Sequence, residues 1–186
     1  MRYFEKLFHT VVISMFLGLM SSLAFAADPV KVGFVYVGPI GDHGWTYRHD
    51  IGRQQVEEAF GDKVKTSYVE SVKYGPDAER VIRMLAETND IVFATSFGYM
   101  EPMLKVAKEF PNVYFEHATG YKQADNMSSY GLRLYQARHV QGIIAGMMTK
   151  TNKICYVAAY PIPEVIREIN TYYMGAKKMN PNVDID

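Results

Sequence analysis

The sequence predicts an α/β fold in which a parallel sheet is flanked by helices. Short apolar runs of strand length alternate with segments of helical periodicity along most of the chain, a pattern typical of strand–helix–strand units with right-handed crossovers. The first run, Lys31 to Val37, is almost continuously apolar, as expected for a strand covered on both faces by helices. A second strand–loop–helix unit begins at Lys153. We therefore predict a first lobe followed by the start of a second.

Residues 1–26 have the pattern of a secretory signal peptide. Arg2 and Lys6 are followed by an apolar stretch at 11–20 and by the small-x-small site Ala24-Phe25-Ala26. The apolar stretch is shorter than the roughly 20 residues that span a bilayer, which disfavours the alternative of a membrane anchor. No cysteine stands at the cleavage site to carry a lipid. We expect a periplasmic protein rather than a lipoprotein.

The first lobe is predicted over residues 27–148. Pro76 suits the first turn of a helix, Gly61 the end of one, and Pro111-Asn112 a turn. With the apolar periodicity, these signals predict helices over 45–60, 76–87, 101–110 and 136–148, and further strands over 64–69, 90–95, 113–116 and 126–134.

The polar segment 149–152 is the predicted crossover to a second lobe over 153–186. That lobe opens with a buried strand over 153–159, a proline-containing loop and a helix over 164–179. Cys155 lies within the apolar run and is expected to be a small buried hydrophobe. The last residues resemble a turn followed by the start of a strand, so we expect a partial second lobe and a truncated sequence.

Composition and motifs exclude several function classes. The net charge is zero and like charges do not cluster, which argues against nucleic-acid partners. The histidines lack ligand spacing and cysteine companions, so no metal is expected. The glycines at 38, 41 and 44 do not match a dinucleotide fingerprint, and no hydrolase elbow or Walker loop is present. The sequence indicates a binding site without catalytic residues or a cofactor.

Candidate binding residues gather in the loops that follow predicted strands, because parallel strands end at one edge of the sheet. Aromatic rings there stand beside hydroxyls and carboxylates, a combination that suits a flat, partly polar ligand. The candidates are Asp42, Trp45, Thr46, Tyr47, Ser96, Phe97, Glu116 and Tyr160.

Some candidates also have structural interpretations. Asp42 equally suits a role at a helix start, where its carboxylate would bind free N–H groups. Trp45 could pack on the sheet instead of stacking on a ligand. Glu116, predicted at the end of a strand, needs a hydrogen-bond partner from either the ligand or the protein.

Two long motifs, Gly41 to Arg53 and Val157 to Arg167, resemble the basic membrane protein family of ABC-transporter substrate-binding proteins. The likeness extends through Tyr130-Gly131-Leu132-Arg133 and the glycine-containing helix up to Gly146. This resemblance implies a periplasmic-binding-protein-like fold in which two α/β lobes close on a ligand. It also implies partnership with the membrane subunits of an ABC importer, and we expect a monomer.

The resemblance implies roles for individual residues as well. Trp45 matches the first-lobe stacking ring, Thr46 its polar neighbour and Asp42 the acidic residue before them. Family members commonly have phenylalanine and asparagine at the first two positions, so a different ligand such as a free nucleobase is implied.

The leading hypothesis is an exported receptor for a purine nucleoside or nucleobase. A periplasmic nucleosidase or hydrolase that uses Asp42 or Glu116 as a base is one alternative. A ligand-sensing module without transport is another.

Overall fold

The computed structural model describes residues 28–186, and its first part is built on a five-stranded sheet with strand order β2-β1-β3-β4-β5. Every neighbouring pair in this sheet is parallel, so the predicted sheet is confirmed. The predicted signal peptide lies outside the described residues. The strands are β1 (Val30–Val35), β2 (Val64–Val69), β3 (Ile91–Ala94), β4 (Tyr114–Ala118) and β5 (Met127–Tyr130).

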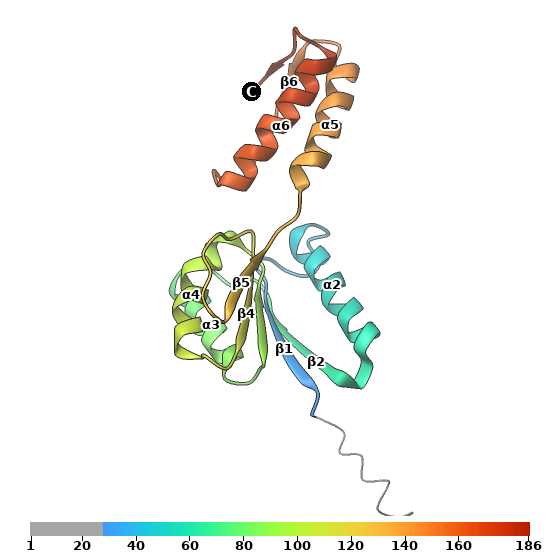
Figure 1. Cartoon of the computed structure of the whole chain (residues 1–186). Helices are drawn as coiled ribbons and strands as arrows, with labels where there is room; N and C mark the ends of the chain where they lie inside the picture. Colours follow the sequence, from blue (N-terminus) through green and yellow to red (C-terminus); the bar gives the residue numbers. More distant parts are fainter. Residues whose placement is uncertain (1–27) are drawn as a thin grey trace, which may run out of the picture.

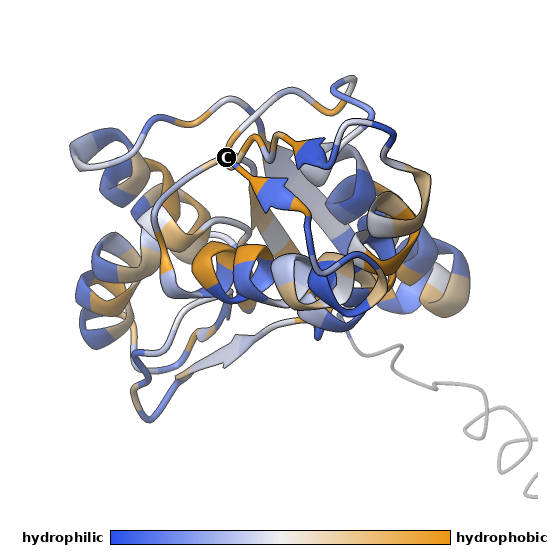
Figure 2. Cartoon of the chain, turned by 90° about the horizontal axis from the view of Figure 1, so that it is seen from above, coloured by the Kyte–Doolittle hydropathy of each residue, from blue (hydrophilic) through white to orange (hydrophobic). Residues whose placement is uncertain are grey.

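Helices cover both faces of this sheet (Figure 1). Helix α2 (Trp45–Phe60) lies on one face, with the 3₁₀ turn η1 (Gly61–Lys63) at its end. Helices α3 (Pro76–Ala86) and α4 (Met100–Glu109) lie on the other, and η2 (Phe97–Tyr99) leads into α4. Orange and blue segments alternate along the helices in Figure 2, as expected for helices with one apolar face. None of the helices in residues 28–186 has both the length and the apolar character needed to cross a membrane.

The core has one layer on each side of the sheet. The larger layer, beneath α3 and α4, contains Val35, Val92 and Phe115, all at most 1% exposed. On the α2 side, Phe34 stacks on Phe93 with 4.9 Å between ring centroids. Burial of these apolar side chains is the main force that holds the loops after each strand at one edge of the sheet.

The second part of the chain is a helix pair, α5 (Leu134–Met148) and α6 (Pro163–Met179), with the short parallel strands β6 (Lys153–Ile154) and β7 (Asp184–Ile185). The two helices pack at very close range. A Cβ atom at Gly142 would overlap the carbonyl oxygen of Tyr172, and one at Gly175 would overlap that of His139. Only glycine allows this approach of the two backbones.

Helix α5 packs on α6, and in Figure 1 the chain leaves the sheet between β5 and α5. The sequence predicts the crossover at 149–152, which would leave α5 in the first lobe. The packing instead favours residues 131–133 as the crossover. Local periodicity could not show this, because it identifies a helix without identifying its partner. The predicted strand over 126–134 is correspondingly shorter, since it ends at Tyr130 and α5 begins at Leu134.

The prediction that Cys155 is buried is wrong, because its side chain is exposed. The predicted strand over 153–159 is paired only at Lys153 and Ile154, and its single partner within residues 28–186 is β7. A two-residue ladder leaves the following apolar residues uncovered, and Val157 is 90% exposed.

Candidate functional site

Two adjoining cavities lie where the loops at the carboxyl edge of the sheet face the start of α6. The larger one, about 360 Å³, has aromatic walls made by Trp45, Tyr74, Phe97 and Tyr160, and we call it the aromatic cavity. The other, of about 350 Å³, is bordered by His43 and His49 as well as by Arg48 and Tyr130, and we call it the histidine cavity.

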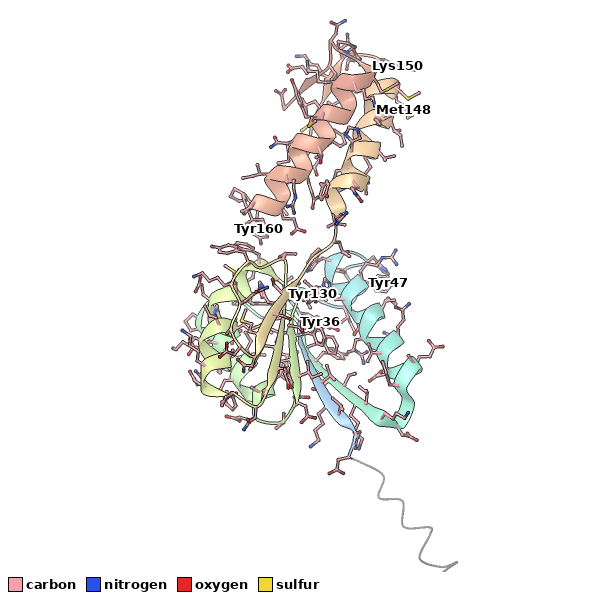
Figure 3. The ribbon with its side chains drawn as sticks, in the orientation of Figure 1. Tyr36, Tyr47, Tyr130, Met148, Lys150 and Tyr160 are labelled. Carbon is pink, nitrogen blue, oxygen red and sulfur yellow. The ribbon has the colours of Figure 1, made fainter. Side chains whose placement is uncertain are left out.

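Trp45, Thr119 and Glu164 border both cavities, so the two hollows adjoin along these residues. Figure 3 shows Tyr160 at the end of the helix pair that faces the sheet, with Met148 and Lys150 at the far end. Strand-end clefts between two lobes are common ligand sites in α/β proteins.

Trp45 is fixed by its edge and open on its face. Its indole Nε1 donates a hydrogen bond to the carbonyl oxygen of Thr95 at 2.5 Å. The centroids of the Trp45 and His49 rings are 4.7 Å apart. Burial lowers the pKa of His49, although its Nδ1 contacts the Trp45 carbonyl oxygen at 2.9 Å and opposes the shift. Trp45 is still 38% exposed, so the held indole has surface available for a ligand.

Asp42 is engaged by the backbone at the start of α2. Its carboxylate accepts N–H bonds from Gly44 at 2.7 Å, Tyr47 at 3.0 Å and Thr46 at 3.2 Å. Slight desolvation works against ionisation, but these bonds outweigh it and lower the pKa of Asp42. The carboxylate therefore stabilises the helix start, and it borders neither cavity.

The next two predicted residues also support the loop. Thr46 is fully buried, and its Oγ1 accepts an N–H bond from Gly38 at 3.1 Å. Tyr47 is half-buried beside the ring of His43, with 5.3 Å between centroids, and it is outside the lining of both cavities. These contacts hold the loop that presents Trp45.

Ser96 and Phe97 line the aromatic cavity, as does Tyr160 from the loop before α6. The Ser96 Oγ lies 2.8 Å from the hydroxyl of Tyr74, and the Tyr74 ring meets that of Tyr160 edge-on, with centroids 6.4 Å apart. Tyr74 from the sheet-containing part and Tyr160 from the helix pair thus form one continuous aromatic wall of this cavity.

Glu116 lies away from these residues. It is in the middle of β4, level with Phe93 and Ser128, and it accepts a 2.6 Å hydrogen bond from the Ser128 hydroxyl. It borders a separate hollow of about 210 Å³. Because β4 runs two residues beyond the predicted strand end, His117 is buried under the edge of the sheet instead, with Nε2 2.8 Å from the Ser96 carbonyl oxygen.

The sequence prediction missed Tyr74 and Glu164 as cavity residues. Tyr74 lies in the loop after β2, where it stands beside polar residues in 70–75, so the same strand-end pattern could have identified it. Glu164 has the position of an ordinary acidic residue in the first turn of a helix, and only its place beside both cavities distinguishes it. Within residues 28–186, no group of three or more histidine, cysteine, aspartate or glutamate side chains is placed to hold a metal ion.

Comparison with known proteins identifies the family. The profile for ABC transporter substrate-binding protein PnrA-like (Bmp) matches residues 29–186. The purine-binding protein of Brucella abortus is 52% identical over 165 residues, which cover 88% of this chain and 47% of that protein. A Haloferax volcanii protein described as a candidate ABC transporter glucose-binding protein is 45% identical over 155 residues, covering 83% of this chain and 39% of the relative. The chain thus spans less than half the length of these two relatives.

Solved structures support the same fold. A solute-binding protein of an ABC transporter system from Aeropyrum pernix has a TM-score of 0.74 at 22% identity, over 84% of this chain and 46% of that one. Another from Conexibacter woesei has a TM-score of 0.65 at 23% identity, over 84% of this chain and 53% of that one. The fold is therefore periplasmic-binding-protein-like, as the sequence predicts. With the family profile covering nearly all described residues, the chain belongs to the Bmp family of PnrA-like ABC transporter substrate-binding proteins.

Proposed function

We propose that this chain forms the ligand-binding part of an exported solute receptor that captures a purine base or nucleoside and delivers it to an ABC importer. The observation that carries the proposal is the aromatic cavity, in which rings of Trp45, Tyr74, Phe97 and Tyr160 meet from both parts of the chain. A purine presents two flat faces that stack on aromatic rings and polar edges that accept or donate hydrogen bonds.

The relatives support this ligand class. The Brucella protein, named for purine binding, shares about half of its aligned residues with this chain. The aromatic cavity, of about 360 Å³, offers the aromatic walls on which a flat base stacks. Closure of the two parts around the ligand would exclude water and requires no bond breaking. We therefore propose binding and transport rather than catalysis, by a periplasmic monomer that docks on importer membrane subunits.

Isothermal titration calorimetry on the purified protein tests the ligand class. Adenine, guanine, adenosine and guanosine form one series, and glucose forms a second because of the Haloferax relative's description. We expect saturable binding of at least one purine and none of glucose. Binding of glucose without purines would replace the proposed ligand. Chromatography after incubation with adenosine tests the enzyme alternative, since a nucleosidase would release adenine.

A further inference from the structure

Glu164 places a carboxylate at the junction of the two cavities. It lies in the first turn of α6 and borders both the aromatic cavity and the histidine cavity. Its side chain makes no hydrogen bond or ion pair with another residue in 28–186. The next carboxylate on the same helix, Glu168, is paired with Arg138 at 2.9 Å. Burial and the charge of Glu168 raise the pKa of Glu164, and Arg167 only partly offsets them. A half-buried carboxylate without a protein partner favours a ligand that can donate to it.

Glu164 differs from the other polar groups that line the aromatic cavity, because those groups are neutral. The Ser96 hydroxyl and the Tyr74 hydroxyl bind each other, and the Trp45 N–H is used by Thr95. Among residues 28–186, Glu164 is the only charged residue that lines this cavity. A ligand stacked on Trp45 therefore meets an acceptor with two oxygens and a negative charge.

Purines differ in what they offer such an acceptor. All of these free bases have ring N–H donors, but adenine and guanine add an exocyclic amino group that donates further N–H bonds, whereas purine itself and hypoxanthine lack that group. Hydrogen bonds to a charged partner are stronger than hydrogen bonds between neutral groups, and a ligand that covers the half-buried carboxylate without donating to it is penalised. Building on the proposed function, we propose that Glu164 is a specificity-determining residue that selects aminopurines by accepting hydrogen bonds from their exocyclic amino group.

Two pairs of ligands isolate the amino group. Adenine and purine differ only in the 6-amino group, and guanine and hypoxanthine only in the 2-amino group. Calorimetry on the purified protein gives the affinity ratio within each pair. We expect a ratio of about tenfold or more for the pair whose aminopurine binds more tightly. In Glu164→Gln, which keeps the shape but removes the charge, we expect that ratio to fall to a few-fold.

The ratio is measured within one variant, so a misfolded fraction lowers the fitted stoichiometry for both ligands and leaves the affinity ratio intact. Glu58→Gln, an exposed carboxylate of α2 that borders neither cavity, is the matched control and should keep the wild-type ratio. If purines bind but Glu164→Gln keeps the wild-type ratio, the role of Glu164 is refuted while the proposed function stands. If no purine binds to the wild-type protein, the proposed function itself fails.

Discussion

Replacing Trp45 separates the two contributions that its indole makes to the site. The ring face borders both cavities and is 38% exposed, while the ring edge is tied to Thr95 through a 2.5 Å hydrogen bond. Trp45→Ala removes both features. Trp45→Phe keeps an aromatic face and removes only the N–H donor and part of the surface.

The structure allows the two losses to be ranked. Stacking of a base on an aromatic side chain contributes about 1–3 kcal/mol, so Trp45→Ala should raise the Kd for a purine by about 5- to 150-fold. The hydrogen bond to Thr95 contributes a net of about 0.5–1.5 kcal/mol, and it acts by holding the ring in place. Trp45→Phe should therefore raise the Kd by no more than about tenfold.

The assay is isothermal titration calorimetry, because the variants lack the tryptophan that a fluorescence assay needs. Phe60→Ala, a 54% exposed aromatic residue at the other end of α2, is the matched control and should bind like the wild type. Circular dichroism confirms that each variant is folded. If folded Trp45→Ala keeps the wild-type Kd, Trp45 is not a stacking surface and the proposed location of the ligand is wrong.

Three further predictions concern stability. Gly142→Ala should lower the free energy of unfolding in urea by about 1–3 kcal/mol, because the added Cβ overlaps the α6 backbone. Gly52→Ala in α2, with open space around it, should instead raise it by about 0.5–1 kcal/mol. Equal effects of the two substitutions would contradict the packing of the helix pair. Burial lowers the pKa of His117, so folding stability should be lost as the pH falls below about 6.5 and toward the folded-state pKa. His117→Gln should reduce that loss in thermal melts between pH 7 and 5. A variant whose stability depends on pH as the wild type does would refute this prediction. Asp50→Asn weakens the buried hydrogen bond that the Arg53 Nε donates to the Asp50 carboxylate at 2.7 Å, and it should cost about 2–3 kcal/mol of folding stability. An unfolding midpoint like that of the wild type would count against this prediction.

Much of the sheet could be predicted because its signals are local. Apolar runs of strand length, bounded by Gly61 and the turn at 111–112, set the alternation of strands and helices. Parallel topology then predicts that the strand-end loops meet at one edge, and Trp45, Phe97 and Tyr160 do line one cavity there.

The rest depends on contacts between distant residues. Asp42 has the composition of a ligand-binding residue, but three backbone N–H groups engage its carboxylate. Glu116 moves to mid-strand because β4 continues beyond the predicted end. Glu164 needs the helix pair to be placed against the sheet before its position at both cavities becomes visible. Cys155 could be judged exposed only once its strand was known to have a two-residue partner.

Titration of the intrinsic fluorescence of Trp45 tests most directly whether a purine binds in the aromatic cavity. Trp45 is the only tryptophan of this chain, and its ring borders that cavity. Adding adenine or guanine, or the corresponding nucleosides, should change its emission saturably, with the same Kd that calorimetry gives. Calorimetric binding of a purine without any change in Trp45 emission would place the ligand elsewhere and contradict the account.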